Sequence, residues 1–256
     1  MASSQLTFSA HLGFLYTHLP LVQAVAAARA DGFHAVECHW PFDTPATDLA
    51  QAVQNADCPL VSLNTRRGDV AAGDNGLAAI PSRQPQARDA IGQAIAYADA
   101  VGARAVHVMA GRAIGPAAAE TFLQNLDYAA TLAAQNGLTI LIEPLNAHDA
   151  PGYFLTTTYQ AQALLRDLGR ANVKLMFDCY HVARTEGDVV ARLDATLFDI
   201  GHIQIAAVPD RTAPHRGTLN YADVFDALRA LGWSHPIGAE FRPNADGTID
   251  TRFMTL

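Results

Sequence analysis

Eight short apolar runs alternate along the chain with longer, alanine-rich amphipathic stretches. Each run is four to eight residues long and rich in Val, Ile, Leu or Phe, which is typical of a buried strand. The runs span residues 6–12, 34–39, 59–64, 104–109, 138–143, 172–178, 200–205 and 236–241. A protein with such runs at regular intervals buries them side by side in one sheet, so we expect a parallel sheet with helical connections.

The stretches between the runs carry helical periodicity, and several end at a glycine that suits a left-handed C-cap. They include residues 21–32, 87–102, 117–137 and 221–232. Eight strand–helix repeats in 256 residues predict one (β/α)8 TIM barrel that occupies residues 1–256 as a single domain. A doubly wound open sheet is the alternative. Only NADGTIDTRFMTL follows the last strand, so the barrel is expected to have a shortened C-terminal segment without a full closing helix.

Composition narrows the class of protein. The formal charge is −8 and no basic run exceeds two residues, which argues against a nucleic-acid surface. Three widely spaced cysteines fit a reducing compartment and form no CxxC metal motif. The N-terminus lacks the pattern of a signal peptide, and the apolar runs are too short for a membrane span. We therefore expect a cytoplasmic protein with no membrane partner. The Gly-, Pro- and Arg-containing segment 65–86 is the longest loop and a candidate substrate loop.

Polar side chains end the last four predicted strands. These are Glu143, Asp178, Gln204 and Glu240, and their spacing is close to one strand–helix unit. Because strand carboxyl ends meet at one face of a barrel, the four should converge on one pocket. Three acids in one pocket raise each other's pKa values unless a cation lies among them. Oxygen ligands of this kind suit Mg²⁺ or Mn²⁺. The alternative is that each residue merely caps a loop.

Further polar residues follow other strands. His181 lies three residues after a strand-end acid, so it is a candidate substrate ligand or acid–base group; packing on the first turn of a helix is the alternative. Asn64, Arg66 and Arg67 follow the third strand, and Arg211 follows the seventh. Arginine is the natural partner of a substrate carboxylate, through paired hydrogen bonds. A solvated loop arginine is the alternative for each.

Two more titratable residues occupy predicted strands. His107 either faces the inside of the barrel or is a satisfied core histidine. Glu37 is a buried-looking acid on the second strand, which either orients groups of the site or pairs with His11 or His39.

Several long segments resemble the hydroxypyruvate isomerase family of the xylose-isomerase-like barrel superfamily. They include ADGFHAVECHWPFDTP, GDVAAGDNGLAAIPSR, ILIEPLNAHDAPGYFLTTTYQA, FDCYHVARTEGD, GHIQIAAVPDR, RGTLNYADVFDALRALG and IGAEFRP, and they run almost end to end. The resemblance implies a divalent-metal site, with Glu143 and Glu240 as proton donor and acceptor. Asp178 and Gln204 match the remaining ligand positions.

The same resemblance extends to substrate contacts and has three departures. His181 and Arg211 resemble substrate-contact positions of the neighbouring ketose epimerases. His11 stands where the family commonly has asparagine, the loop after the third strand reads NTRRGD, and the C-terminal segment is abbreviated. All three departures lie where a substrate is selected.

The expected reaction is isomerisation of a small 2-oxo-3-hydroxy acid, such as hydroxypyruvate to tartronate semialdehyde. A metal would stabilise the enediolate, one glutamate would remove a proton and the other would return it. The sequence leaves open which glutamate acts first. A 2-oxo-tetronate isomerase or a ketose 3-epimerase would use the same site. Two other functions are further hypotheses: an abasic-site endonuclease and a non-catalytic sugar-acid binding protein. The protein is also a candidate homodimer.

Overall fold

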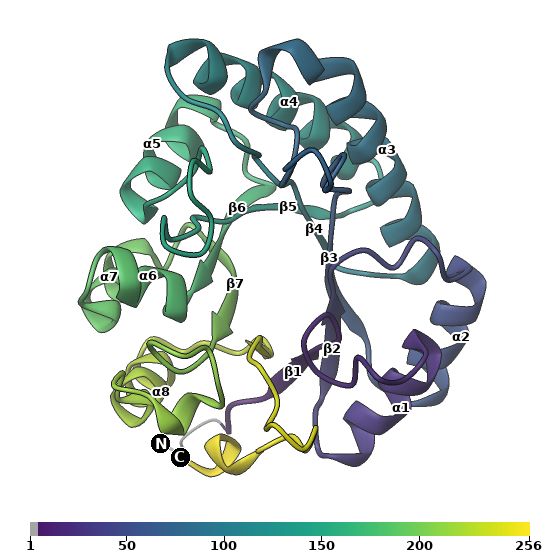
Figure 1. The fold of residues 1–256 in the computed structure, drawn as a ribbon, viewed down its shortest axis with the longest axis vertical. Coiled ribbons are helices and arrows are strands. Elements are labelled where there is room, and N and C mark those ends of the chain that lie inside the picture. The colour runs from purple at the N-terminus through teal and green to yellow at the C-terminus, as the bar shows by residue number, and fades with distance from the viewer. Residues whose placement is uncertain (1–4) are drawn as a thin grey trace.

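A computed structural model describes residues 5–256 of the chain, and its centre is a closed barrel of eight parallel strands in sequential order (Figure 1). The strands are β1 (Phe8–His11), β2 (Ala35–Cys38), β3 (Leu60–Asn64), β4 (Ala105–His107), β5 (Thr139–Ile142), β6 (Val173–Asp178), β7 (Ile200–Ile205) and β8 (Ile237–Ala239). Their side chains are nearly all buried, because helices cover the outside of a parallel sheet. The predicted TIM barrel is confirmed.

Helices form a ring around the barrel in Figure 1. They are α1 (Leu21–Ala30), α2 (Ala46–Asn55), α3 (Gln84–Val101), α4 (Pro116–Ala134), α5 (Thr158–Leu168), α6 (Cys179–Thr185), α7 (Val189–Thr196) and α8 (Tyr221–Ala230). Two of them, α6 and α7, share the connection between β6 and β7. Among the described residues, no helix has both the length and the hydropathy to cross a membrane.

The loop after β3 is shorter than the predicted 65–86. A 3-10 turn covers Pro81–Arg83 and α3 begins at Gln84, so Pro85 lies inside the first helical turn. Proline favours loop structure in a sequence, because it lacks a backbone N–H. The N–H groups of the first helical turn have no partner within the helix, so Pro85 is tolerated there.

The C-terminal segment closes the barrel without a helix, as predicted. Strands β1 and β8 pair directly, and the last residues form a 3-10 turn at Arg252–Thr255. Phe253 of this turn is fully buried and packs edge-on against Phe8 and Phe241. In Figure 1 this yellow segment lies between α8 and α1, in the place of a helix that would follow the eighth strand. One aromatic side chain thus covers the seam between the first and last strands.

The register of the strands decides which side chains meet at the carboxyl end. Asp178 at the end of β6 is level with Gln204 of β7, and Gln204 is level with Gly238 of β8. On the other side of the barrel, Asn64 of β3 is level with His107 of β4. These residues therefore surround one point on the barrel axis.

Candidate active site

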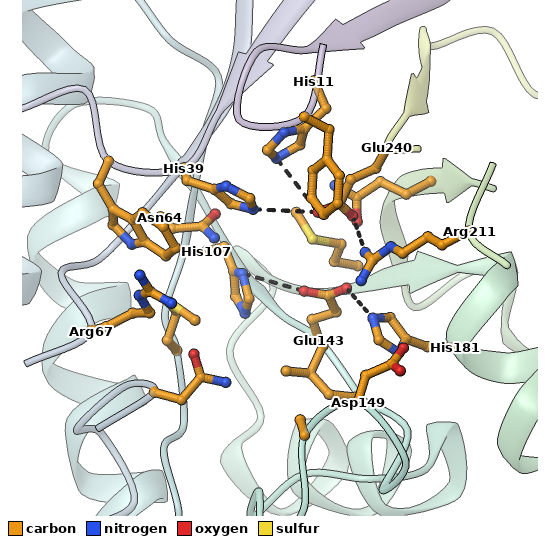
Figure 2. Close-up of a pocket in the computed structure, with 18 residues that line it drawn as sticks. His11, His39, Asn64, Arg67, His107, Glu143, Asp149, His181, Arg211 and Glu240 are labelled. Atoms are coloured by element: carbon orange, nitrogen blue, oxygen red, sulfur yellow. Dashed lines mark ion pairs between the residues drawn. The ribbon is translucent and has the colours of Figure 1, made fainter. Parts of the chain in front are cut away.

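A cavity of about 190 Å³ opens at the carboxyl end of the barrel (Figure 2). Residues from nearly every strand end and from the loop after β3 line it, and most are polar or aromatic. The lining residues are His11, Phe14, His39, Trp40, Asn64, Arg67, Asn75, His107, Met109, Glu143, Leu145, Asp149, Ala150, Met176, His181, Gln204, Arg211 and Glu240. Its volume suits a ligand of a few carbon atoms.

Glu240 follows β8 and is surrounded by donors. One of its oxygens lies 3.3 Å from His39 Nε2 and 3.7 Å from His11 Nε2, and the other lies 3.0 Å from an Arg211 nitrogen. Burial by itself raises the pKa of Glu240, but Arg211 and the two histidines outweigh it and hold that pKa well below its ordinary value. Glu240 is therefore a carboxylate at neutral pH.

Glu143 follows β5 on the opposite wall of the cavity (Figure 2). Its carboxylate oxygens lie 3.5 Å from His107 Nδ1 and 3.9 Å from His181 Nε2. Burial and the charges of Glu240 and Asp178 raise its pKa well above the ordinary value, and Arg211 offsets this only partly. The two glutamates thus face each other in environments that favour opposite protonation states, which is a common feature of acid–base pairs.

Arg211 supplies the positive charge of the site. One of its guanidinium nitrogens lies 3.0 Å from Glu240 and 3.4 Å from Asp178. The backbone at Arg211 has φ of 52°, a left-handed conformation that is uncommon for arginine. Hydrogen bonds hold it there, from its own N–H to the Ala207 carbonyl and from the N–H of Arg242 to its carbonyl. The chain thus accepts local strain to aim this side chain into the site.

Asp178 and Gln204 lie deeper. Asp178 caps α6 with one oxygen, which accepts from the Tyr180 N–H, and turns the other toward Arg211 and His181. Burial raises the pKa of Asp178 to about 7, although Arg211 opposes this shift. Gln204 donates from Nε2 to Glu37, and its Oε1 is buried without a hydrogen-bond partner in the described residues.

Two histidines present N–H groups to the cavity. The Nδ1 of His181 accepts from the Asn146 backbone N–H, and the Nδ1 of His11 accepts from that of Gly13. A neutral imidazole carries one proton, so in both rings it must be on Nε2. Burial lowers the pKa of His11 to about 4 and of His181 to about 3, so both rings are neutral. The Nε2 atom of His11 lies 3.7 Å from Glu240, and that of His181 lies 3.9 Å from Glu143. His181 lies on the first turn of α6, as one sequence interpretation had it, and still reaches the cavity.

The arginines after β3 separate in the structure. Arg67 lies over the Trp40 ring at 4.0 Å and lines the cavity beside Asn64. Arg66 points outward, donates to Gln93 and does not line the cavity. Its predicted role in substrate binding is therefore not supported, because successive side chains of an extended segment face opposite ways. Within residues 5–256, Arg67 has no ion-pair partner, so its charge is free for a ligand.

Some cavity residues were missed in the sequence. Asn75 and Asp149 come from loops, where no periodic signal marks them. His39 was considered only as a partner for Glu37, yet its ring packs at a tilt against that of His11 and contacts Glu240. A Cβ on Gly13 would lie 2.2 Å from the His39 ring and 2.9 Å from the His11 ring. Glycine at position 13, just after β1, therefore leaves the space that these two histidines occupy.

The donor set fits a divalent cation. Glu143 and Asp178 bring carboxylate oxygens within 4.8 Å of each other, beside His181. Among residues 5–256 the buried Gln204 Oε1 has no hydrogen-bond partner, and this observation most directly indicates a missing ligand. Neither His181 nor His11 fits as a ligand through Nε2, because that atom holds the ring proton. An oxygen-rich set is typical of Mg²⁺ or Mn²⁺.

His107 provides a test of the burial of this site. Both of its ring nitrogens are buried without a hydrogen-bond partner in the described chain, and burial lowers its pKa to about 3. The unfolded chain binds this proton below pH ~6.5, whereas the folded chain does not, so the free energy of unfolding falls as pH drops below ~6.5. His107→Asn should make this fall shallower by up to about 1.4 kcal/mol per pH unit. Urea unfolding between pH 4.5 and 7, with a chelator present, measures it.

The matched control is His34→Asn, at an exposed position, which should leave the slope as in the wild type. Equal slopes for His107→Asn and the wild type would show that His107 is not held neutral.

The closed barrel agrees with the comparisons to known proteins. Residues 25–254 match the model of the xylose isomerase-like TIM barrel family, and the chain belongs to this family. It is 43% identical to the 2-oxo-tetronate isomerase of Cupriavidus necator over 93% of both chains. It is 33% identical to the hydroxypyruvate isomerase of Escherichia coli, over 97% of this chain and 98% of that protein.

Solved structures give the same fold. A crystal structure described as AP endonuclease, family 2, from Brucella melitensis is 35% identical and superposes with a TM-score of 0.90 over 94% of both chains. An L-ribulose 3-epimerase superposes with a TM-score of 0.77 over 98% of this chain and 86% of that one. That epimerase is only 20% identical, so it supports the fold alone.

Proposed function

We propose that this chain is an isomerase that interconverts a small 2-oxo-3-hydroxy acid and its 2-hydroxy-3-oxo isomer, with hydroxypyruvate and tartronate semialdehyde as the first candidates. One observation carries the proposal: Glu143 and Glu240 face each other across a small cavity, where burial raises the pKa of Glu143 while Arg211 and two histidines lower that of Glu240. Relatives named hydroxypyruvate isomerase and 2-oxo-tetronate isomerase support the same reaction class.

From the opposite pKa shifts of this pair we infer an order for the proton transfers. Glu240, held ionised by Arg211 and the histidines, removes the proton from C3 of the substrate. The electrons of that C–H bond form the C2–C3 double bond, and the C2 carbonyl electrons move onto its oxygen. Glu143, on the other wall, gives its proton to C2 while the O3–H proton passes to O2 and C3 becomes the carbonyl. One proton leaves carbon and one returns, so no redox cofactor is needed.

The negative charge of the enediolate needs stabilisation. Arg211 lies between Glu240 and Asp178, and the Nε2–H groups of His11 and His181 point into the cavity. These preorganised donors stabilise an oxyanion that forms among them. A divalent cation, if held by Glu143, Asp178, Gln204 and Glu240, would polarise the carbonyl and hydroxyl oxygens.

Arg67 is the group that we assign to the substrate carboxylate. Trp40 holds its guanidinium at the cavity wall, and Asn64 beside it offers a further amide. Figure 2 shows both across the cavity from Arg211 and His181. A substrate that lies across the cavity places its carboxylate at Arg67 and its reacting carbons between Glu143 and Glu240. This arrangement selects acids over neutral sugars.

Arg67→Met should raise KM for the acid substrate by about 10- to 100-fold with a smaller effect on kcat, because it removes a charged contact made before and during the reaction. Steady-state kinetics measure this split. Arg66→Met, one residue away but outside the cavity, is the matched control and should leave KM unchanged. A reversed result, with KM raised only by Arg66→Met, would contradict the assignment.

The proposal is tested by proton NMR in D2O. The protein is incubated separately with hydroxypyruvate, 2-oxo-tetronate and fructose, each with added Mg²⁺ or Mn²⁺ and each with a chelator. Conversion or deuterium uptake with an acid supports the proposal, and its loss on chelation supports the metal. Exchange with fructose alone would instead favour a ketose 3-epimerase, and silence with all three would contradict isomerase activity.

2-Oxo-tetronate is the second candidate substrate. It carries the same carboxylate, 2-oxo and 3-hydroxyl groups as hydroxypyruvate with one further carbon, so the same proton transfers apply. The 43% identity to a protein of that name favours it. The ratio of kcat/KM for the two acids decides between them.

A nuclease or a binding protein fits less well. The chain carries a net charge of −8, which repels a DNA backbone, although one similar structure bears the name AP endonuclease. A protein that only binds a sugar acid does not need two opposed acid–base groups. Absence of cleavage of an abasic-site duplex would complete the distinction.

A further inference from the structure

A layer of polar side chains crosses the inside of the barrel directly beneath the candidate active site. Its centre is Glu37 of β2, of which only 1% is exposed. Four side chains from three other strands point at this carboxylate. They are Ser9 at 3.2 Å, Ser62 at 3.3 Å, His202 at 2.8 Å and Gln204 at 3.0 Å. Glu37 does pair with a histidine, as one sequence hypothesis had it, but the partner is His202 and not His11 or His39.

This layer is costly for a structural core. The interior of a TIM barrel is usually filled by branched apolar side chains, and a buried carboxylate must be paid for by donors on every side. The neighbouring strand makes room for it: a Cβ on Gly238 would lie 2.0 Å from a Glu37 oxygen and 2.8 Å from Gln204. An apolar layer would stabilise the barrel as well, so the polar layer requires a reason other than stability.

The position of Gln204 provides that reason. A carboxylate only accepts hydrogen bonds, so the amide of Gln204 must turn its Nε2 toward Glu37. Its Oε1 then points the other way, where it is buried beside the cavity with no hydrogen-bond partner in the described part of the chain. Had the amide been free to rotate, either atom could face the substrate.

We propose that Glu37 is a positioning residue that locks the amide of Gln204 so that an oxygen, and never an N–H, faces the reacting atoms. Resting on the proposed isomerase function, this oxygen accepts the hydroxyl hydrogen of the substrate or holds a cation. An N–H at the same place would repel both. His202, at 2.8 Å, is the partner that holds Glu37 in place from below.

Glu37→Gln tests this role with almost no change of shape. A glutamine at this position both donates and accepts, so Gln204 is no longer restricted to one orientation. We expect kcat/KM to fall about 10- to 100-fold, as is usual when the partner of a site ligand is removed. Ser62→Ala is the matched control, because Ser62 also bonds Glu37 but does not touch Gln204, and it should change kcat/KM by less than about threefold.

A double-mutant cycle separates positioning from general damage. If Glu37 acts through Gln204, then Glu37→Gln should have almost no further effect on kcat/KM in a Gln204→Ala background. Additive losses, or an equal loss for Ser62→Ala, would overturn the proposal.

Side-chain amide NMR of the wild-type protein tests the proposal, and it requires neither an activity assay nor a variant that folds. With ¹⁵N-labelled glutamine, the Nε2 protons of Gln204 in the wild type should exchange with solvent at least about tenfold more slowly than those of the exposed Gln51, because a buried carboxylate holds them. Rapid exchange would overturn the proposal by itself. Slow exchange in a protein that isomerises no acid would leave the positioning intact and contradict only the proposed function.

Discussion

Glu240→Gln is expected to lower kcat by at least about 10³-fold while the barrel stays folded. Glutamine has the size of glutamate and still accepts from His39, but it cannot take a proton from carbon. Loss of a general base alone typically costs about 10²- to 10⁴-fold, and here the residue also carries the charge that Arg211 balances. KM should change far less than kcat, because the lost step belongs to the transition state.

The decisive measurement is deuterium exchange at the substrate carbon, followed by NMR. Exchange should disappear in Glu240→Gln, since proton removal is the step that fails. Thermal unfolding and circular dichroism verify the fold, and Glu120→Gln on the exposed face of α4 is the matched control with wild-type turnover. Turnover of Glu240→Gln close to that of the wild type would exclude Glu240 as the base.

Arg211→Met is expected to lower kcat/KM at neutral pH by about 10²- to 10⁴-fold. The guanidinium lies between Glu240 and Asp178. It holds the pKa of Glu240 down and opposes the rise that burial causes in the pKa of Asp178. Without it, two buried acids face each other with no fixed cation between them, so the pKa of Glu240 rises and the base becomes protonated. The stabilising charge for the enediolate is lost at the same time.

The sign of this effect is visible in the pH profile of kcat/KM. Since Arg211 lowers the pKa of Glu240, the acidic limb of the profile should move to higher pH in Arg211→Met, and part of the activity should return as the pH is raised. Arg211→Lys keeps the charge but loses the planar fork, so its acidic limb should stay near that of the wild type while its rate is reduced. An unshifted limb in Arg211→Met would show that Arg211 does not set the protonation of the base.

The fold is largely a property of local sequence. Apolar runs of strand length recur at the interval that a strand–helix unit requires, and helical stretches between them end at residues such as Gly102, whose φ of 77° suits the left-handed cap. The errors are local: Pro85 was taken as loop and lies in the first turn of α3. Its neighbours along the chain do not reveal whether a proline ends a loop or begins a helix.

The carboxylates of the site were also visible in the sequence, because strand ends of a barrel converge and Glu143, Asp178 and Glu240 each end one. Three matters were decided only by tertiary structure. The sequence does not say that Arg67 faces the cavity while Arg66 faces solvent, or that Arg211 stands between two acids. Nor does it say that Glu37 takes His202 rather than His11 as its partner. Strand ends are set by short-range periodicity, whereas Glu37 and His202 are 165 residues apart in the chain and only the closed barrel brings them to 2.8 Å.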